Sequence, residues 1–196
     1  MTGEFHLRLA RPGEEDAIVQ FLDAHWEWKL PLVHVPQFFE FYYRPFGGAP
    51  QFALALQNGR ICAAAGFIRA NAGENPDVWA SIWAADEAAP GAGMELMAAL
   101  PRLANARFCA VNNIRKKVVG LYRFLGYAAG RLPHYYRLAA QSGHRVARVA
   151  APRILPLPET GLALRRVPGA QALPGMFRLQ PQLRPFKDYW YLSRRY

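Results

Sequence analysis

The chain has 196 residues, of which 52% are hydrophobic, and this fits one ordinary domain with an extension. It contains no run of about 18 apolar residues and no basic-then-apolar leader, so neither a membrane span nor a signal peptide is predicted. Cys62 and Cys109 lie in apolar runs without partner spacing, and no His, Cys or carboxylate cluster has metal-ligand spacing. We therefore expect a cytoplasmic protein with reduced cysteines and no metal site.

The net charge of +10 is unevenly distributed along the chain. Residues 1–100 carry 6 Lys/Arg and 12 Asp/Glu, a net −6, whereas residues 101–196 carry 18 Lys/Arg and 2 Asp/Glu, a net +16. A basic half indicates an anionic partner, such as a phosphate-rich cofactor, a nucleotide-bearing substrate, nucleic acid or a membrane surface. The basic residues are scattered and RNA-type aromatic motifs are missing, so nucleic acid is not favoured, while a solvated Arg-rich face stays open.

The first half of the chain begins with a strand-like and then a helix-like pattern. Residues 5–12 alternate apolar and polar side chains, as a half-buried strand does. Residues 14–28 open with acids, as helix N-termini prefer, and place Ile18, Phe21, Leu22 and His25 on one face. A second, aromatic helix is expected over residues 35–44, and Gly47, Gly48 and Pro50 end it.

The clearest local signal is the stretch QFALALQNGRICAAAGFIRA. Its two apolar runs flank Asn58-Gly59, a pair that favours a tight hairpin turn. Further strands are expected at 77–85, 107–113, 128–132 and 134–140, and helices from the 90–93 joint to about 105 and over 114–127, the latter ended by Gly126. This order predicts an α/β fold with a mixed sheet, antiparallel in its first half, and a strand–helix–strand crossover between residues 77 and 111.

The joint Pro90-Gly91-Ala92-Gly93 links an expected strand to an expected helix. Small residues at a helix N-terminus let an anion approach unpaired amides, so a phosphate loop is one interpretation and a plain turn is the other. The joint is neither a P-loop, because it lacks the Lys and the terminal Ser/Thr, nor a dinucleotide fingerprint, because Leu96 stands where the third glycine would be.

Over residues 5–138 the chain resembles the GNAT superfamily of acyl-CoA-dependent N-acyltransferases. The resemblance rests on LRLARPGEEDAIVQFL, on PGAGMELMAAL after a strand, and on VVGLYRFLGYAAG. It implies a mixed, mostly antiparallel central sheet flanked by helices, with two strands splayed at the acyl-CoA site, and acetyl-CoA as acyl donor. More narrowly, residues 25–43 with 78–93 look similar to bacterial members tied to polysaccharide or amino-sugar biosynthesis.

The resemblance also implies which residues bind the cofactor. Backbone amides of the loop would hold the pyrophosphate, and the end of the preceding strand would pair with the pantetheine arm. The implied set is Ile82, Trp83, Ala84, Ala89, Gly91, Ala92, Gly93, Met94 and Asn113. The sequence departs from the family pattern at Ala88, where a Gln or Arg is usual, and at Arg115, where an Asn is usual.

Tyr122 matches the family tyrosine that protonates the leaving thiolate, and the alternative is an aromatic packed in the core. Asp77, Ser81 and Asp86 are candidates for the general base, and Asp86 is equally a turn residue. For the acceptor, aromatic faces with few polar tips suit sugar rings, although a packed aromatic core accounts for the same residues. The expected acceptor-binding residues are His25, Trp26, His34, His134 and Tyr136.

We expect residues 1–140 to form a GNAT-like domain and residues 141–196 to be a basic, Pro/Arg-rich extension, whose end FKDYWYLSRRY resembles the start of a second such half. The predicted function is acetyl-CoA-dependent N-acetylation of a small amine, such as an amino sugar or nucleotide-sugar, by direct attack on the thioester. The alternative is a non-catalytic module that binds acyl-CoA or a partner. A homo-oligomer remains open.

Overall fold

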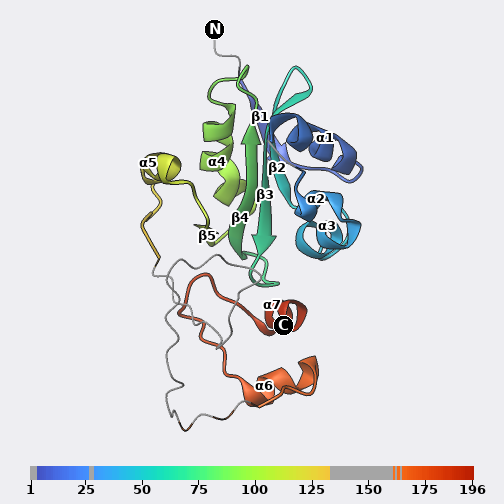
Figure 1. Ribbon diagram of the computed structural model, residues 1–196, viewed down its shortest axis with the longest axis vertical. Coiled ribbons are helices and arrows are strands. Elements are labelled where there is room, and N and C mark those ends of the chain that lie inside the picture. Colours follow the sequence, from blue (N-terminus) through green and yellow to red (C-terminus); the bar gives the residue numbers. More distant parts are fainter. Residues whose placement is uncertain (1–3, 27–28, 133–160, 162, 164) are drawn as a thin grey trace, which may run out of the picture.

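A computed structural model describes residues 4–26, 29–132, 161, 163 and 165–196 (Figure 1). The strands are β1 (His6–Leu9), β2 (Phe52–Gln57), β3 (Arg60–Arg69), β4 (Asp77–Ala85) and β5 (Phe108–Val111). The α-helices are α1 (Glu15–His25), α2 (Pro31–His34), α3 (Pro36–Tyr43), α4 (Ala92–Leu103), α5 (Val119–Phe124), α6 (Leu173–Met176) and α7 (Tyr189–Arg195), with 3-10 turns η1 (Lys116–Val118) and η2 (Ala170–Ala172). No helix among the described residues is long and apolar enough to cross a membrane.

The five strands form one sheet in the order β1-β2-β3-β4-β5. The first four are antiparallel neighbours, and β5 pairs with β4 in parallel, which confirms the predicted mixed sheet and the crossover through α4. Asn58 (φ 52°) and Gly59 (φ 78°) form the β2–β3 turn in the left-handed region, as the Asn-Gly pair predicts. Hairpin pairing thus places β3 and β4 at the centre of the sheet.

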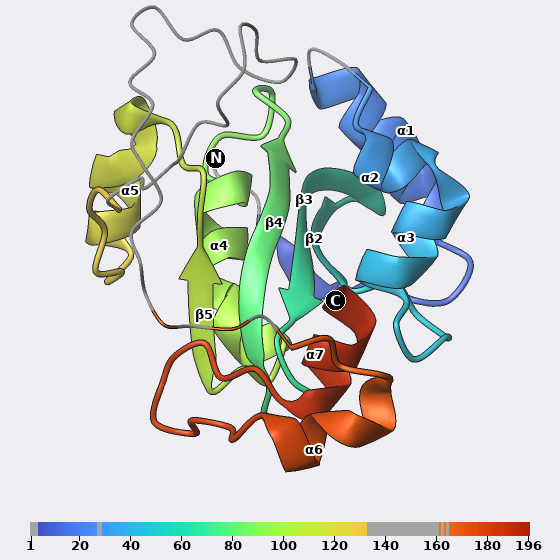
Figure 2. The same cartoon turned by 60° about the horizontal axis from the view of Figure 1, so that its bottom comes forward.

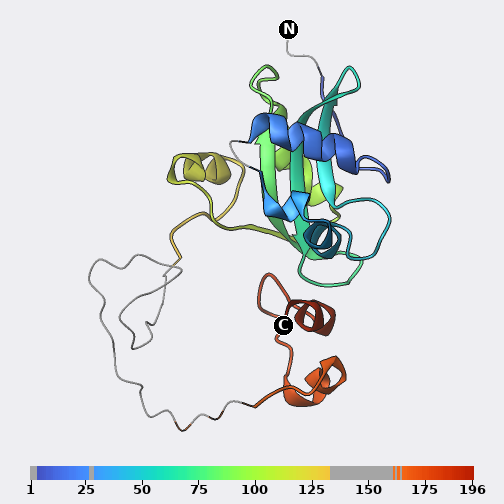
Figure 3. The same ribbon diagram turned by 45° about the vertical axis from the view of Figure 1, so that its right-hand side comes forward.

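Helices cover both faces of the sheet. Helix α4 packs on one face through Leu96, Met97 and Leu100, while α1, α2 and α3 pack on the other (Figures 1 and 3). In α1 the buried residues are Ile18, Phe21 and Leu22, whereas His25, the fourth residue of the predicted face, is exposed. The layers are therefore helix, sheet and helix, with a separate apolar cluster on each side of the sheet.

Alanine dominates the middle of the sheet. Fully buried alanines on β2 and β3 contact α4 from one face and the α1–α3 layer from the other. They are Ala53, Ala55, Ala63, Ala64 and Ala65. With a single methyl group at each position, both helical layers lie close to the strands.

The strand expected at 128–132 is absent, because these residues have no strand pairing. Arg123 of α5 instead donates from Nε and Nη2 to the Ala129 carbonyl at 3.1 and 3.0 Å, which ties this stretch to α5. The strand expected at 134–140, with His134 and Tyr136, lies outside the described residues.

The last residues of the chain return to the sheet. Helix α7 lies beside α3 and the β3–β4 end of the sheet (Figure 2). The Trp190 ring stacks on Phe46 at 4.9 Å between centroids, Arg194 donates to the Phe41 carbonyl at 2.9 Å, and Arg195 bonds the Tyr42 hydroxyl. The C-terminal segment, residues 184–196, is thus packed against the α/β unit.

Candidate functional site

Strands β4 and β5 run together only over four residue pairs. Asp77 to Ala80 pair with Phe108 to Val111, and then β5 ends while β4 continues to Ala85. From Ser81 onward one edge of β4 has no strand partner among the described residues. An unpaired strand edge presents free N–H and C=O groups to a ligand. This opening agrees with the splayed strands that the sequence resemblance implies.

A β-bulge lies where the opening begins. Ala80 faces Phe67 and Trp83 faces Ala65, so Ser81 and Ile82 together oppose the single residue Gly66. Gly66 has no room for a side chain, because a Cβ there would lie 2.9 Å from the Tyr43 ring and 3.0 Å from the Phe52 ring. A bulge re-aims the strand's side chains and interrupts its ladder, so the direction of the β4 side chains changes where the edge becomes free.

Ser81 is anchored from the α1–α3 face. Its hydroxyl lies 2.6 Å from the hydroxyl of Tyr43, a fully buried residue of α3. Burial is the main reason that the pKa of Tyr43 lies well above its ordinary value, and the hydrogen bond to Ser81 opposes that rise. Tyr43 therefore stays neutral and holds the Ser81 oxygen at the mouth of the opening.

A cavity of about 790 Å³ occupies the same place. Its floor is β4 from Trp79 to Ile82, its sides are Trp26 and the end of α3, and Asn112 and Asn113 border it after β5. The C-terminal segment closes the remaining side with Lys187, Trp190, Tyr191, Arg194, Arg195 and Tyr196. The cavity thus connects the β4 edge, the first helices and the end of the chain.

The loop between β4 and α4 is held by its own backbone. The Ala89 amide donates to the Asp86 carbonyl at 3.1 Å, and the Ala92 amide donates to the Ala89 carbonyl at 3.1 Å. The Asp86 carboxylate accepts from the Ala88 amide at 2.9 Å, so Asp86 is a turn residue here. These bonds occupy two amides of the predicted cofactor set, those of Ala89 and Ala92, whereas no acceptor among the described residues is bonded to the amides of Gly93 and Met94.

Each glycine of the loop has its own structural reason. Gly91 has a φ of 95°, a conformation that glycine adopts without strain. Gly93 has an ordinary backbone, but a Cβ there would lie 2.8 Å from the Ala85 Cβ and 3.2 Å from the Trp83 indole. Gly93 therefore lets the N-terminus of α4 lie directly on the end of β4, over the buried Trp83 Nε1, which has no partner among the described residues.

Tyr122 lies on the α4 face beside the end of β4. Its ring is 6.3 Å from the Trp83 ring and 5.5 Å from the Tyr127 ring, and the residue is 5% exposed. Burial raises its pKa above the ordinary value, and the nearby Cys109 adds to this. Burial likewise raises the pKa of Cys109, whose sulfur accepts a hydrogen bond from the Tyr127 hydroxyl at 3.5 Å. Tyr122 and Cys109 are therefore both protonated at neutral pH.

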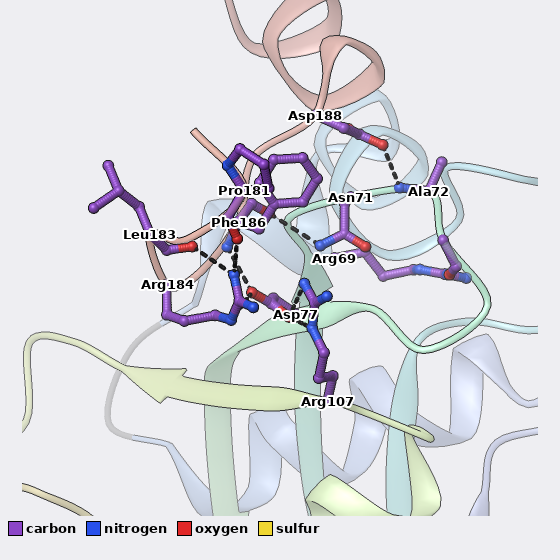
Figure 4. Close-up of polar contacts among 11 residues, drawn as sticks. Arg69, Asn71, Ala72, Asp77, Arg107, Pro181, Leu183, Arg184, Phe186 and Asp188 are labelled. Carbon is purple, nitrogen blue, oxygen red and sulfur yellow. Dashed lines mark hydrogen bonds and ion pairs between the residues drawn. The ribbon is translucent and has the colours of Figure 1, made fainter. Parts of the chain in front are cut away.

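Asp77 is at the other end of β4, eight residues from Ala85 or about 26 Å along the strand. Its fully buried carboxylate accepts from Arg107 Nε at 3.0 Å and from the Phe186 amide at 2.6 Å, and it pairs with Arg184 at 3.8 Å (Figure 4). Asp77 does not line the cavity, and its contacts attach the C-terminal segment to β4. The base role predicted for Asp77 stays a prediction, at a place distant from the opening.

Of the predicted acceptor-binding residues that the structure describes, only Trp26 lies at the cavity. Trp26 lines the cavity, but His25 is exposed and packs on Phe21 at 4.4 Å, and His34 Nε2 pairs with the Asp23 carboxylate at 2.7 Å. Neither histidine lines the cavity, because His25 is exposed on α1 and the half-buried His34 pairs with Asp23. His134 and Tyr136 lie outside the described residues.

Sequence reasoning missed the cations of the cavity. They are Arg69, Lys187, Arg194 and Arg195, and three of them belong to the last ten residues. The available signal was the interleaving of basic and aromatic residues in FKDYWYLSRRY. Among the described residues no group of His, Cys, Asp and Glu side chains has the arrangement of a metal site.

The chain has similar proteins among solved structures but not among protein families or curated sequences. No protein-family model matches the chain, and no curated protein matches it in sequence. Among solved structures, the chain is similar to the aminoglycoside N-acetyltransferase AAC(6')-Iy in complex with the bisubstrate analogue CoA-S-monomethyl-acetylneamine. The sequence identity is 15% and the TM-score is 0.52, and the match covers 70% of this chain and 99% of that chain. The chain is also similar to a possible acetyltransferase from Clostridium difficile 630, with 10% identity, a TM-score of 0.50, and coverage of 71% and 100%.

These similarities concern the fold, because the identities are low. They cover nearly the whole of each neighbour but leave about 30% of this chain without a counterpart. The mixed five-stranded sheet flanked by helices, with the parallel pair at one edge, agrees with them. The chain therefore has the fold of the GNAT acetyltransferases, as its sequence predicts.

Proposed function

We propose that the protein is an acetyl-CoA-dependent N-acyltransferase that acetylates a small amine. The observation that carries the proposal is the free edge of β4 after Ala80, which opens into a cavity of about 790 Å³ and leads to the Gly91–Met94 turn. The fold supports the same conclusion, since AAC(6')-Iy has been solved with CoA and with a CoA bisubstrate analogue.

The residues near the turn suit an acyl-CoA. The free amides of Gly93 and Met94 at the start of α4 would hold the pyrophosphate, with the helix dipole favouring the negative charge. The backbone of Ile82, Trp83 and Ala84 would pair with the pantetheine arm, and Asn113 (φ 55°) would border it from the end of β5. Acetyl-CoA supplies a thioester, whose acyl carbon is open to attack by an amine.

The chain's own groups then have distinct tasks. The amine nitrogen forms a bond to the acyl carbon, the C–S bond breaks, and Tyr122 donates its proton to the departing thiolate. Tyr122 is protonated for this task, because burial raises its pKa. Ser81, Asn112 and Asn113 are among the uncharged polar side chains that line the cavity. Water that they hold would carry the proton of the attacking amine to solvent, and solvent would return a proton to Tyr122.

The aromatic walls of the cavity, including Trp26 and Trp79, favour a ring-shaped acceptor such as an amino sugar. A place in polysaccharide biosynthesis rests on the sequence resemblance alone, and a cytoplasmic location rests on the cysteine pattern and on the lack of a leader-like segment. The direct test is to incubate the protein with acetyl-CoA and a panel of amino sugars and to measure released thiol. Turnover supports an enzyme.

A non-catalytic module is the second candidate. It is favoured by Ala88, which offers no side-chain contact to a phosphate, by the occupied amides of Ala89 and Ala92, and by the Glu95 carboxylate, 3.8 Å from the Cβ position of Gly91. Calorimetric titration with acetyl-CoA beside dephospho-CoA separates the cases. Tight binding without turnover on any amine supports an acyl-CoA-binding module. No binding at millimolar ligand contradicts the enzyme and leaves only a module that docks a partner.

A further inference from the structure

The walls of the cavity carry positive charge and no negative side chain. Arg69 comes from β3, while Lys187, Arg194 and Arg195 come from the C-terminal segment. No Asp or Glu side chain belongs to the lining in the described part of the chain. The cavity is therefore a concave site whose cations come from β3 and from the C-terminal segment, with Arg194 and Arg195 in contact with α3.

Aromatic rings, and not carboxylates, hold these cations. The Arg194 guanidinium lies 4.7 Å from the centre of the Phe41 ring and 5.3 Å from that of Trp190, and Arg195 lies 5.5 Å from that of Tyr42. None of the four cations forms an ion pair within the described ranges, whereas the neighbouring Arg44 pairs with Glu15 and Glu40. Stacking fixes a guanidinium in place and leaves its charge available to an anion.

The cavity and the α4 loop lie on opposite faces of the sheet. Trp26, Phe41 and Tyr42 belong to the α1–α3 face, and the Gly93 turn packs with α4 on the other face. They meet at the free edge of β4. The cations are therefore placed to contact what occupies the α1–α3 side, which is the acceptor when the donor's pyrophosphate is at α4.

We propose that the acceptor is an amine that also carries a phosphate group, and that the C-terminal segment supplies the cations that recognise it. This inference rests on the proposed function and deepens it. Guanidinium groups form paired, charge-assisted hydrogen bonds with phosphate oxygens. Polycationic amines such as aminoglycosides are disfavoured, because like charges oppose each other across a concave site.

The test compares three acceptors of the same amino-sugar type: glucosamine 6-phosphate, glucosamine and the polycation neamine. For the intact protein we expect kcat/KM to be at least about tenfold higher for glucosamine 6-phosphate than for glucosamine, which corresponds to one charge-assisted contact. We expect neamine to be the poorest acceptor. Equal or better turnover of glucosamine or neamine overturns the inference while leaving the proposed acyltransfer intact.

Variants assign the effect to the C-terminal segment. Lys187→Gln with Arg195→Gln removes two exposed cations and is expected to raise KM for glucosamine 6-phosphate about tenfold or more, with KM for glucosamine unchanged. Arg102→Gln, an exposed cation on α4 outside the cavity, is the matched control and is expected to change neither value. Equal KM values in the double variant and the control contradict the inference.

A binding measurement separates this inference from the acyltransfer reaction itself. Glucose 6-phosphate has no amine to acetylate, so its calorimetric titration does not depend on turnover. The anion site is supported if glucose 6-phosphate binds, glucose does not, and the double variant binds glucose 6-phosphate about tenfold more weakly. This result would hold even where no amine is acetylated. Failure of glucose 6-phosphate to bind at millimolar concentration, with glucosamine still acetylated, refutes the phosphate site alone.

Discussion

Gly91 and Gly93 are two residues apart and are required for different reasons. Gly91 has a positive φ, whereas a Cβ on Gly93 would lie only 2.8 Å from the Cβ of Ala85. The first glycine is therefore needed for the turn, and the second for the packing of α4 on β4. Any anion that binds there uses the amides that this packing brings to the end of β4.

Gly93→Ala is expected to lower the free energy of unfolding by about 1–3 kcal/mol, because the new methyl group must displace Ala85 or Trp83. Acetyl-CoA binding should weaken with it, since α4 moves away from β4. Urea unfolding and calorimetric titration measure the two effects. Gly120→Ala is the control, because nothing lies within 4 Å of its Cβ position, and this variant should not be destabilised.

Tyr122→Phe is expected to lower kcat about 100-fold with the Kd for acetyl-CoA unchanged, because the variant loses the proton donor and keeps the ring between Trp83 and Tyr127. Steady-state kinetics and calorimetry give the two values. Tyr127→Phe is the matched control, since it removes only the hydrogen bond to Cys109. Unaltered turnover in Tyr122→Phe means that the residue serves only the core.

At the scale of elements, β4 joins two parts of the site. Its first residue, Asp77, holds the C-terminal segment through Phe186 and Arg184, and its free edge after Ala80 is the floor of the cavity. Asn71 and Ala72, in the loop before β4, add hydrogen bonds to Phe186 and Asp188 at 3.0 and 2.8 Å. The wall formed by α7 thus depends on contacts at the start of the same strand.

Asp77→Asn is expected to destabilise the fold by about 2 kcal/mol, below the range of about 3–5 kcal/mol for a fully buried pair, because Arg107 and Arg184 are partly exposed. Amide hydrogen exchange in residues 184–195 should accelerate. In Asp23→Asn, which breaks an exposed pair with His34 far from that segment, exchange there should stay slow. Unchanged exchange in Asp77→Asn would show that the aromatic contacts of α7 suffice.

For the whole molecule, four tyrosines make the free energy of unfolding fall at alkaline pH. Burial raises the pKa of Tyr43, Tyr122, Tyr127 and Tyr191 above the ordinary value of about 10. Above that pH the unfolded chain loses these protons and the folded chain keeps them. The contribution of these tyrosines to the free energy of unfolding is therefore complete below about pH 10 and is lost as the pH rises. Urea unfolding between pH 8 and pH 11 measures the slope, which should be smaller in Tyr43→Phe; a flat profile contradicts the expectation.

The fold was predictable because its signals are local. The Asn58-Gly59 turn, the alternation of β1 and the acidic start of α1 each specify an element without reference to distant residues. The site was only partly predictable, because Asp77 looks like any polar residue on a strand until Arg107, Arg184 and Phe186 surround it. The two histidines on α1 and α2 were likewise misplaced, since a helix's rotation about its axis is set by packing.

The alanines at the centre of β2 and β3 also bear on which substitutions the protein tolerates. A scan of all single substitutions should find Ala53, Ala63 and Ala65 as intolerant of larger residues as a reacting group would be, although they carry no chemistry. An added methylene there would lift α4 from the sheet and carry the Gly93 turn with it. Sensitivity to mutation in this protein therefore reports the spacing between the sheet and its helices as well as the position of the candidate site.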